Sequence, residues 1–277
     1  MGETRRYRRR VGKKGSTQQP MFKRIIEGFR RLRQKPDLEE DAGCYWGMSD
    51  REARIRDQSH WCGAMRWNSN RWYEHGDFYL RLTLKYLERY AGVDYLTGLS
   101  RLVALEWGCG GGAVVRALCR RFALVYGVDV SKASVAESVR RIKHLGLPNY
   151  RGIAFPSGDP ASVLNGVTAG SVDFIISVNV FQHFPSKPYT ARALKVMGAL
   201  LRLGGFALLQ TRYFDGSRKL QQKDGDYARN VIYMTSFAPG EFLLLLEAAG
   251  LELLERTRDI EGDPDCHDYY FVRKVSD

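Results

Sequence analysis

Short apolar runs alternate with stretches of helical periodicity along most of the chain. Five runs have the length of β-strands and lie at 102–105, 123–128, 150–155, 172–178 and 206–211. The fourth is almost entirely apolar, as expected for a parallel strand that is buried on both faces. Between the runs, apolar residues recur every three or four positions, which predicts helices through Val114–Phe122, at 134–145 and at 188–201.

The alternation changes near the end of the chain. A predicted helix at 239–249, ended by Gly250, is followed by two strands at 251–256 and 269–274 that an acidic turn connects. This order is typical of an antiparallel pair. The whole pattern predicts an α/β fold with a doubly wound, mostly parallel seven-stranded sheet, one antiparallel edge strand, helices on both faces and an N-terminal helical and aromatic cap.

The positive charge of the chain is concentrated in its first residues. The net charge is +12, and residues 1–36 carry 13 basic and two acidic residues, so the remainder is close to neutral. We expect residues 1–20 to be a basic disordered tail. Residues 21–91 are predicted to form an N-terminal helical cap region, and residues 92–277 a domain that holds the sheet, with a polar, loop-like insertion at 212–238 on the substrate side.

Residues 21–35 combine an apolar helical stripe with basic residues, and Pro36 ends the predicted helix. This helix either docks on the folded body or lies at the surface, where it meets an anionic membrane or nucleic acid. The sequence leaves both alternatives open. A possible partner of the basic tail is therefore an anionic one, either RNA or a membrane surface.

Residues 37–75 contain four of the five tryptophans. Their indoles either pack against the core or form the roof of a ligand pocket. For the second case, and together with the two aromatic residues that follow the strand at 206–211, the candidate substrate-pocket residues are Trp61, Arg66, Trp72, Tyr213 and Phe214. A helix with an apolar face is predicted at 77–91, directly before the first strand.

The five cysteines are scattered, contain no C-x-x-C pair and match no zinc-site spacing. We therefore expect reduced thiols, no metal and a cytoplasmic location. No apolar run approaches the ~20 residues of a membrane span, and no apolar signal segment follows Met1. The arginine-rich start can imitate an organelle transit peptide, but its arginines cluster instead of recurring at helical spacing.

The stretch from Arg101 to Val130 has the pattern of a cofactor-binding unit. A strand ends at Glu106, a glycine-rich turn leads into a helix, and a second strand ends at Asp129. Glycines suit such a turn because they adopt unusual backbone angles and let the main chain approach a ligand closely. An acid about 20 residues after the turn can accept hydrogen bonds from ribose hydroxyls, so the unit is typical of a nucleoside-containing cofactor.

Four motifs in this order resemble class I S-adenosylmethionine-dependent methyltransferases, over roughly Leu102–Lys274. They are the acid and glycine loop EWGCGGG at 106–112, GVDVS at 127–131, GDPA at 158–161 and VDFIISVNVFQH at 172–183. The acid at the head of the first motif favours S-adenosylmethionine over a dinucleotide, because a pyrophosphate would be repelled by a carboxylate. LLRLGGF at 200–206 completes the set.

The resemblance implies S-adenosylmethionine as cofactor, S-adenosylhomocysteine as product and no metal. It implies that Glu106 receives the cofactor's ammonium group, Asp129 the ribose hydroxyls and Asp159 the adenine amino group. The cofactor-binding residues that it implies are Glu106, Gly108, Cys109, Gly110, Gly112, Asp129, Val130, Asp159, Pro160, Ser177, Val178 and Asn179.

Methyl transfer is an in-line displacement in which the protein mainly positions the nucleophile and excludes water. A hydroxyl or protonated amine also needs a proton acceptor. His183 follows the fourth strand, where the resemblance places the active centre, and is the candidate general base; the alternative is that it only shapes its loop. His60 and Asp57 are weaker candidates.

The acceptor is predicted to be a small molecule, methylated on oxygen, nitrogen or carbon. The sequence lacks the Asn-Pro-Pro-Tyr type of motif, the Pro-Cys nucleophile and an acid cluster for magnesium that mark some other methyltransferases. Two alternatives remain open. One is an RNA methyltransferase that uses the basic N-terminal tail, and the other is a non-catalytic cofactor-binding partner subunit.

Overall fold

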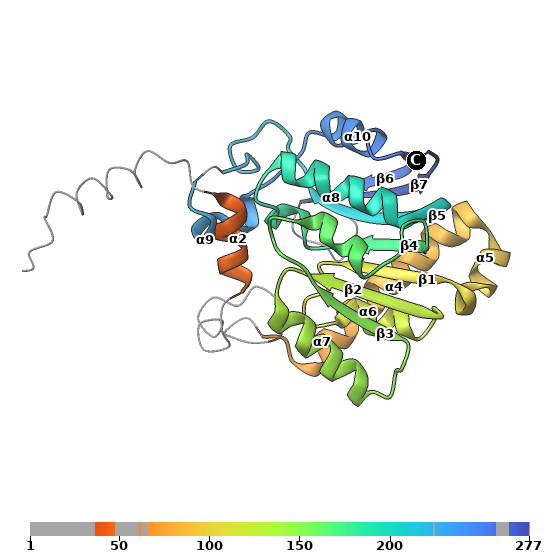
Figure 1. The fold of residues 1–277 in the computed structure, drawn as a ribbon. Helices are drawn as coiled ribbons and strands as arrows, with labels where there is room; N and C mark the ends of the chain where they lie inside the picture. Colours follow the sequence, from red (N-terminus) through yellow and green to blue (C-terminus); the bar gives the residue numbers. More distant parts are fainter. Residues whose placement is uncertain (1–36, 48–60, 62–65, 224, 259–265, 277) are drawn as a thin grey trace, which may run out of the picture. The chain divides into compact units, whose positions relative to one another are not determined.

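The computed structural model describes residues 37–47, 61, 66–223, 225–258 and 266–276 (Figure 1). Residues 37–277 form one compact unit. The predicted basic tail, the predicted helix at 21–35, Asp57 and His60 lie outside the described residues, so their interpretation stays a prediction. The division of the chain at residue 91 into cap and domain also stays a prediction.

A seven-stranded sheet forms the centre of the fold, in the order β3-β2-β1-β4-β5-β7-β6. The first five strands run parallel to one another, as expected for strands that alternate with helices. The strands are β1 (Val103–Trp107), β2 (Leu124–Asp129), β3 (Tyr150–Ala154), β4 (Val172–Ser177), β5 (Leu201–Arg212), β6 (Leu251–Arg258) and β7 (His267–Lys274).

The antiparallel pair at the end of the chain is confirmed. β7 runs antiparallel to both β5 and β6 and lies between them, so the single antiparallel strand is one place in from the edge and β6 is the edge strand. The predicted fold class, a mostly parallel seven-stranded sheet with helices around it, is therefore confirmed.

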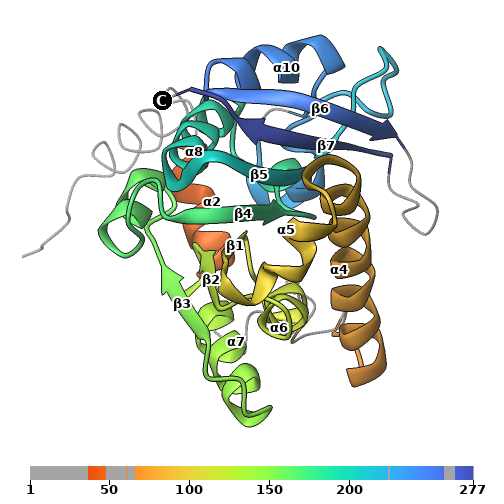
Figure 2. The ribbon, with the colours of Figure 1, turned by 90° about the vertical axis from the view of Figure 1, so that its right-hand side faces the viewer.

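Helices cover both faces of the sheet (Figure 2). On one face, α8 (Lys187–Leu200) and α10 (Pro239–Glu247) pack with the 3-10 helix η2 (Pro160–Asn165). The other face carries α4 (Ser69–Ala91), α5 (Val93–Thr97), α6 (Ala113–Cys119) and α7 (Lys132–His144). Each face has its own apolar core, and the alternating strand–helix pattern of the sequence follows from this double covering.

Local signals set where several helices begin. Asn68, Ser131 and Ser186 each accept a hydrogen bond from a backbone N–H in the first turn of α4, α7 and α8. α4 begins eight residues earlier than the predicted 77, because the Asn68 cap lies within the tryptophan-rich segment. α6 has no side-chain cap of this kind, since Gly112 precedes it.

Two segments differ from their prediction. β5 begins at Leu201, directly after α8, and Gly204 and Gly205 lie inside an irregular part of this strand instead of ending the helix. The segment at 212–238 is not simply polar and loop-like: it contains α9 (Tyr227–Asn230) and the 3-10 helix η4 (Val231–Tyr233), and five of its large apolar side chains are buried, those of Leu220, Tyr227, Val231, Met234 and Phe237.

A further helix, α2 (Leu38–Trp46), lies against α9 and buries Ala42 and Tyr45 (Figure 1). Two of its contacts are polar: Ser157 donates a hydrogen bond to the backbone oxygen of Glu39, and Arg192 pairs with the Glu39 carboxylate. None of the described helices is both long and apolar enough to cross a membrane.

We predict that Gly198→Ala destabilises the protein by roughly 1–3 kcal/mol, as overpacking does. Gly198 is buried in α8, and a Cβ there would lie 2.3 Å from the backbone oxygen of Ala249. The control is Gly240→Ala in α10, where a Cβ meets no atom within 4 Å. We expect the control to be neutral or slightly stabilising, since alanine favours helix. Urea unfolding measures both; equal midpoints for the two variants would contradict the prediction.

Candidate active site

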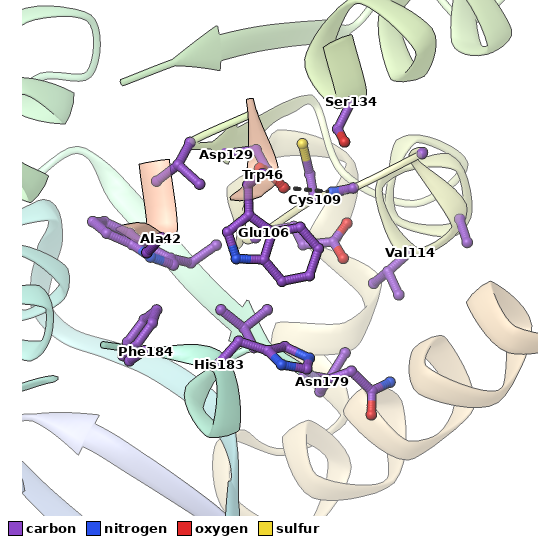
Figure 3. Close-up of a pocket in the computed structure, with 18 of the residues that line it drawn as sticks. Ala42, Trp46, Glu106, Cys109, Val114, Asp129, Ser134, Asn179, His183 and Phe184 are labelled. Carbon is purple, nitrogen blue, oxygen red and sulfur yellow. Dashed lines mark hydrogen bonds between the residues drawn. The ribbon is translucent and has the colours of Figure 1, made fainter. Parts of the chain in front are cut away.

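A cavity opens at the carboxyl ends of β1, β2 and β4 (Figure 3). β1 and β4 are adjacent in the sheet but not in sequence, so the order of strands reverses between them, and this is where doubly wound sheets bind ligands. The cavity encloses about 1040 Å³ of empty space, including its open mouth.

Glu106 lies at the end of β1 and is buried. One of its carboxylate oxygens, Oε2, accepts a hydrogen bond from the backbone N–H of Val115 at 2.8 Å. The carboxylate therefore caps α6, which has no cap of its own. Burial raises the pKa of Glu106 well above its ordinary value of 4.5, and the nearby Asp129 raises this pKa further.

The glycine-rich turn between β1 and α6 is held by two hydrogen bonds from the backbone N–H groups of Gly108 and Cys109 to the Val128 oxygen, at 2.7 and 3.1 Å. Gly108 has φ +80°, and a Cβ on it would lie 2.2 Å from Val180 Cγ2. Only glycine meets both conditions without strain.

Asp129 ends β2 and fixes the turn from the opposite side. Its Oδ2 accepts from the Gly110 N–H at 2.9 Å, and its Oδ1 accepts from the Ser131 N–H at 2.8 Å. Each carboxylate oxygen retains a second lone pair for a ligand hydroxyl. Burial raises the pKa of Asp129, and its backbone hydrogen bonds oppose that rise. Two carboxylates thus face one cavity with no Lys or Arg among the described lining residues.

The predicted cofactor residues divide into two groups. Eight line the cavity: Glu106, Gly108, Cys109, Gly110, Asp129, Val130, Val178 and Asn179. Four do not: Gly112, Asp159, Pro160 and Ser177. Gly112 precedes α6, and Ser177 donates a hydrogen bond to the Trp107 oxygen and so connects β4 to β1. Asp159 is exposed; a role for it toward adenine stays a prediction.

The described residues fit S-adenosylmethionine on chemical grounds. Its ammonium and sulfonium groups are cationic, and cations stabilise the ionised forms of buried Glu106 and half-buried Asp129, whose pKa values are raised. Val130, Phe155 and Ala42 provide apolar contacts beside Asp129 for a flat base.

His183 lies in the 3-10 helix η3 (Phe181–His183) and faces the same cavity. Its Nδ1 lies 2.8 Å from the backbone oxygen of Val231. A carbonyl oxygen accepts only, so Nδ1 carries the proton in this contact, and the lone pair of the neutral ring is on Nε2. This arrangement is what a general base requires.

Asn179 follows β4 and also faces the cavity (Figure 3). Its φ of +58° is unusual for a residue other than glycine. The side chain of Gln210 holds this conformation by accepting a hydrogen bond from the Asn179 N–H. Gln210 is itself buried and donates to Tyr269 Oη at 2.8 Å.

The predicted substrate-pocket residues lie in different places relative to the cavity, and their role stays a prediction. Trp72 lines the cavity, and Trp61 donates from Nε1 to Ser134, a lining residue, at 3.1 Å. Arg66 is exposed and does not line it. Tyr213 and Phe214 do not line it either: Tyr213 pairs with Phe237 and lies under Arg258.

Eight lining aromatic residues were not predicted as site residues: Trp46, Trp67, His75, Trp107, Phe155, Phe184, Tyr189 and Tyr227. Trp46 and His75 belong to the tryptophan-rich segment at 37–75, for which the roof of a ligand pocket was one of the two sequence-based interpretations. Phe155, at the end of the third predicted strand, could have been found by position. Tyr227 had no local signal.

Fold and site together define an α/β protein that binds a nucleoside-containing cofactor at the switch point of its sheet. Comparison with known proteins identifies the class. Residues 105–209 match the family model described as a methyltransferase domain. In structure, the chain is similar to an S-adenosylmethionine-dependent methyltransferase from Methanosarcina mazei, with a TM-score of 0.52, 14% identity and coverage of 64% of this chain and 94% of that one. The chain therefore contains a class I S-adenosylmethionine-dependent methyltransferase domain.

Two curated relatives are similar in sequence. The ubiquinone biosynthesis O-methyltransferase of Acinetobacter baylyi is 27% identical over 155 residues, which cover 53% of this chain and 58% of that protein. The tRNA (guanine-N(7)-)-methyltransferase of Thermus thermophilus is 34% identical over 177 residues, which cover 63% of this chain and 50% of that protein. The chain thus spans little more than half the length of these relatives.

We predict that S-adenosylmethionine binds more weakly as the pH falls through the raised pKa values of Glu106 and Asp129. The ionised carboxylates attract the cationic cofactor, and protonation removes this attraction, so affinity is full above these pKa values and lost below them. Within this pH range, binding releases protons. Titration calorimetry in buffers of different ionisation enthalpy measures the release.

Glu106→Gln is expected to remove most of the proton release, and Glu252→Gln, at an exposed pair with Arg273, is the control. Binding that is independent of pH between about pH 4.5, the ordinary value for Glu106, and neutrality would contradict the assignment.

Proposed function

We propose that the protein transfers a methyl group from S-adenosylmethionine to a hydroxyl oxygen of an uncharged small molecule. The observation that carries the proposal is a single cavity with two carboxylates toward one side and His183 toward the other (Figure 3). The first side suits a cationic cofactor. The second offers a base for an acceptor that must lose a proton.

The charge of the cavity supports a neutral acceptor. Among the described lining residues, the only ones with full charges are Glu106 and Asp129. A phosphate or carboxylate on the acceptor would have no Lys or Arg to pair with there, and burying an unpaired anion is costly. The name of the Acinetobacter relative, an O-methyltransferase, agrees with methylation at oxygen.

The residues of the chain have three roles in this proposal. Glu106 and Asp129 bind and orient the cofactor, which supplies the activated methyl group when bound. The aromatic walls exclude water and restrict the acceptor to a near-attack position. His183 accepts the proton at Nε2.

A second candidate is methylation of RNA. The name of the Thermus relative favours it, as does the positive charge of residues 1–36. Phosphate contacts by such a segment would supply affinity without sequence specificity. In this case the anionic partner of the basic tail would be the substrate itself.

We predict that the protein binds S-adenosylmethionine with micromolar affinity and that Asp129→Asn weakens binding by about tenfold or more, because hydrogen bonds to a charged acceptor are worth roughly 1.5–3 kcal/mol. Asp94→Asn, on the exposed surface of α5, is the control. Titration calorimetry measures the affinities. A wild-type protein that binds no cofactor would refute the proposal, and binding without turnover of any acceptor would favour a non-catalytic subunit.

The RNA candidate makes a separate prediction. RNA binding by the full chain should weaken steeply between 50 and 200 mM salt, roughly 10³-fold or more if six or more phosphates are contacted. Removal of residues 1–36 should abolish that binding. Fluorescence anisotropy with a labelled tRNA measures both. If the shortened chain binds RNA as tightly as the full chain, the tail does not deliver RNA to this site.

A further inference from the structure

Three residues from distant parts of the chain form a connected cluster at the His183 side of the cavity. Trp46 donates from Nε1 to the Tyr227 hydroxyl at 2.8 Å, and Tyr227 donates to the backbone oxygen of His183 at 2.6 Å. The rings of Trp46 and His183 meet edge to face, with centroids 5.4 Å apart. All three residues line the cavity.

The cluster holds each ring in one orientation. The indole of Trp46 is fixed by its hydrogen bond, and Tyr45 packs against both Trp46 and Tyr227, at 5.0 and 5.8 Å between centroids. The imidazole of His183 is fixed by Val231, four residues after Tyr227 in the same 212–238 segment. Rigid side chains of this kind lower the entropy that an acceptor loses when it binds.

The rest of this side of the cavity is also aromatic. Phe184 and Trp67 line the cavity as well, together with His75, whose ring lies 4.4 Å from that of Trp67. Flat aromatic walls favour a flat ligand, because offset and edge-to-face contacts between rings add to the burial of apolar area. No described lining residue offers a cation to an acidic acceptor.

We propose that this cluster is the acceptor subsite, that it takes a phenolic compound and that the phenol hydroxyl lies at His183 Nε2. The proposal rests on the proposed function and specifies its acceptor. The ring of the acceptor packs against the indole of Trp46. Asn179, which follows β4, lines the same cavity and donates from Nδ2 to Tyr79 Oη at 3.3 Å.

The proposed methyl transfer to the phenol oxygen conserves atoms and electrons. The phenol O–H bond breaks and its proton moves to His183 Nε2, while the electron pair stays on oxygen. The new O–CH₃ bond forms as the S–CH₃ bond breaks, and the electron pair of that bond returns to sulfur, which leaves neutral S-adenosylhomocysteine. The imidazolium then gives its proton to water.

The test combines three variants with a panel of acceptors. His183→Asn removes Nε2 but keeps an N–H donor near the Val231 oxygen. Trp46→Leu removes the aromatic wall, and His144→Gln, at the exposed end of α7, is the matched control. The acceptors are phenol, 4-nitrophenol, cyclohexanol, benzoate and benzylamine. Titration calorimetry with S-adenosylmethionine is run on every variant.

We expect the wild type to methylate the two phenols only. His183→Asn should lower kcat for phenol about 10²- to 10⁴-fold, as loss of a general base does. The loss should be much smaller for 4-nitrophenol, which ionises without help. Trp46→Leu should raise KM for the acceptor more than it lowers kcat. The affinity of every variant for S-adenosylmethionine should stay within about twofold of the wild-type value. Such an affinity would show that each variant is folded.

Three results would overturn the proposal. An equal loss for both phenols in His183→Asn would make His183 a structural residue. Methylation of cyclohexanol, benzoate or benzylamine in place of phenols, or of none of the panel, would refute the phenolic acceptor. Benzoate or benzylamine as acceptor would also refute the uncharged hydroxyl acceptor of the proposed function, whereas cyclohexanol would leave that function standing. A wild type that binds no S-adenosylmethionine would refute the proposed function itself, and this inference with it.

Discussion

The site depends on one buried interaction, the hydrogen bond from the Val115 N–H to the Glu106 carboxylate. It joins the end of β1 to the first turn of α6 and so fixes the two sides of the glycine-rich turn. Gly112 provides no side chain for this purpose, although its left-handed conformation lets the chain enter the helix. Asp129 holds the middle of the turn through Gly110. Two acids therefore shape the turn before they bind any ligand.

This construction has an electrostatic cost. Glu106 and Asp129 face one cavity, and burial raises the pKa of both. No described residue of the lining carries a compensating positive charge. A cationic ligand relieves this unfavourable field, whereas an anionic one would increase it. The same arrangement that closes the turn therefore selects a sulfonium and ammonium compound over a dinucleotide, and the choice of cofactor follows from the helix cap.

The sequence predicted the parts of the molecule whose signals are local. The strands alternate with helices at regular spacing, and Glu106 and Asp129 end strands on either side of a glycine-rich turn, so the sheet and the cofactor side could be predicted. The acceptor side could not, because it depends on contacts between distant residues. Trp46 and Tyr227 are 181 positions apart, and nothing in either segment indicates the other. Tyr213 and Phe214 follow β5, yet Tyr213 pairs with Phe237 and neither residue lines the cavity, which their position after a strand did not indicate.

The two sides of the cavity also differ in how far the methyltransferase family match covers their residues. The family match at 105–209 includes Glu106 in β1, Asp129 in β2 and His183 in η3, which follows β4. Trp46, His75 and Tyr227 lie outside it, in α2, α4 and α9. The part of the chain that resembles known methyltransferases thus contains the two carboxylates and His183, whereas Trp46, His75 and Tyr227 belong to segments that the match does not cover. The acceptor must for this reason be inferred from those walls, and their fixed, uncharged aromatic rings favour a flat, neutral ring.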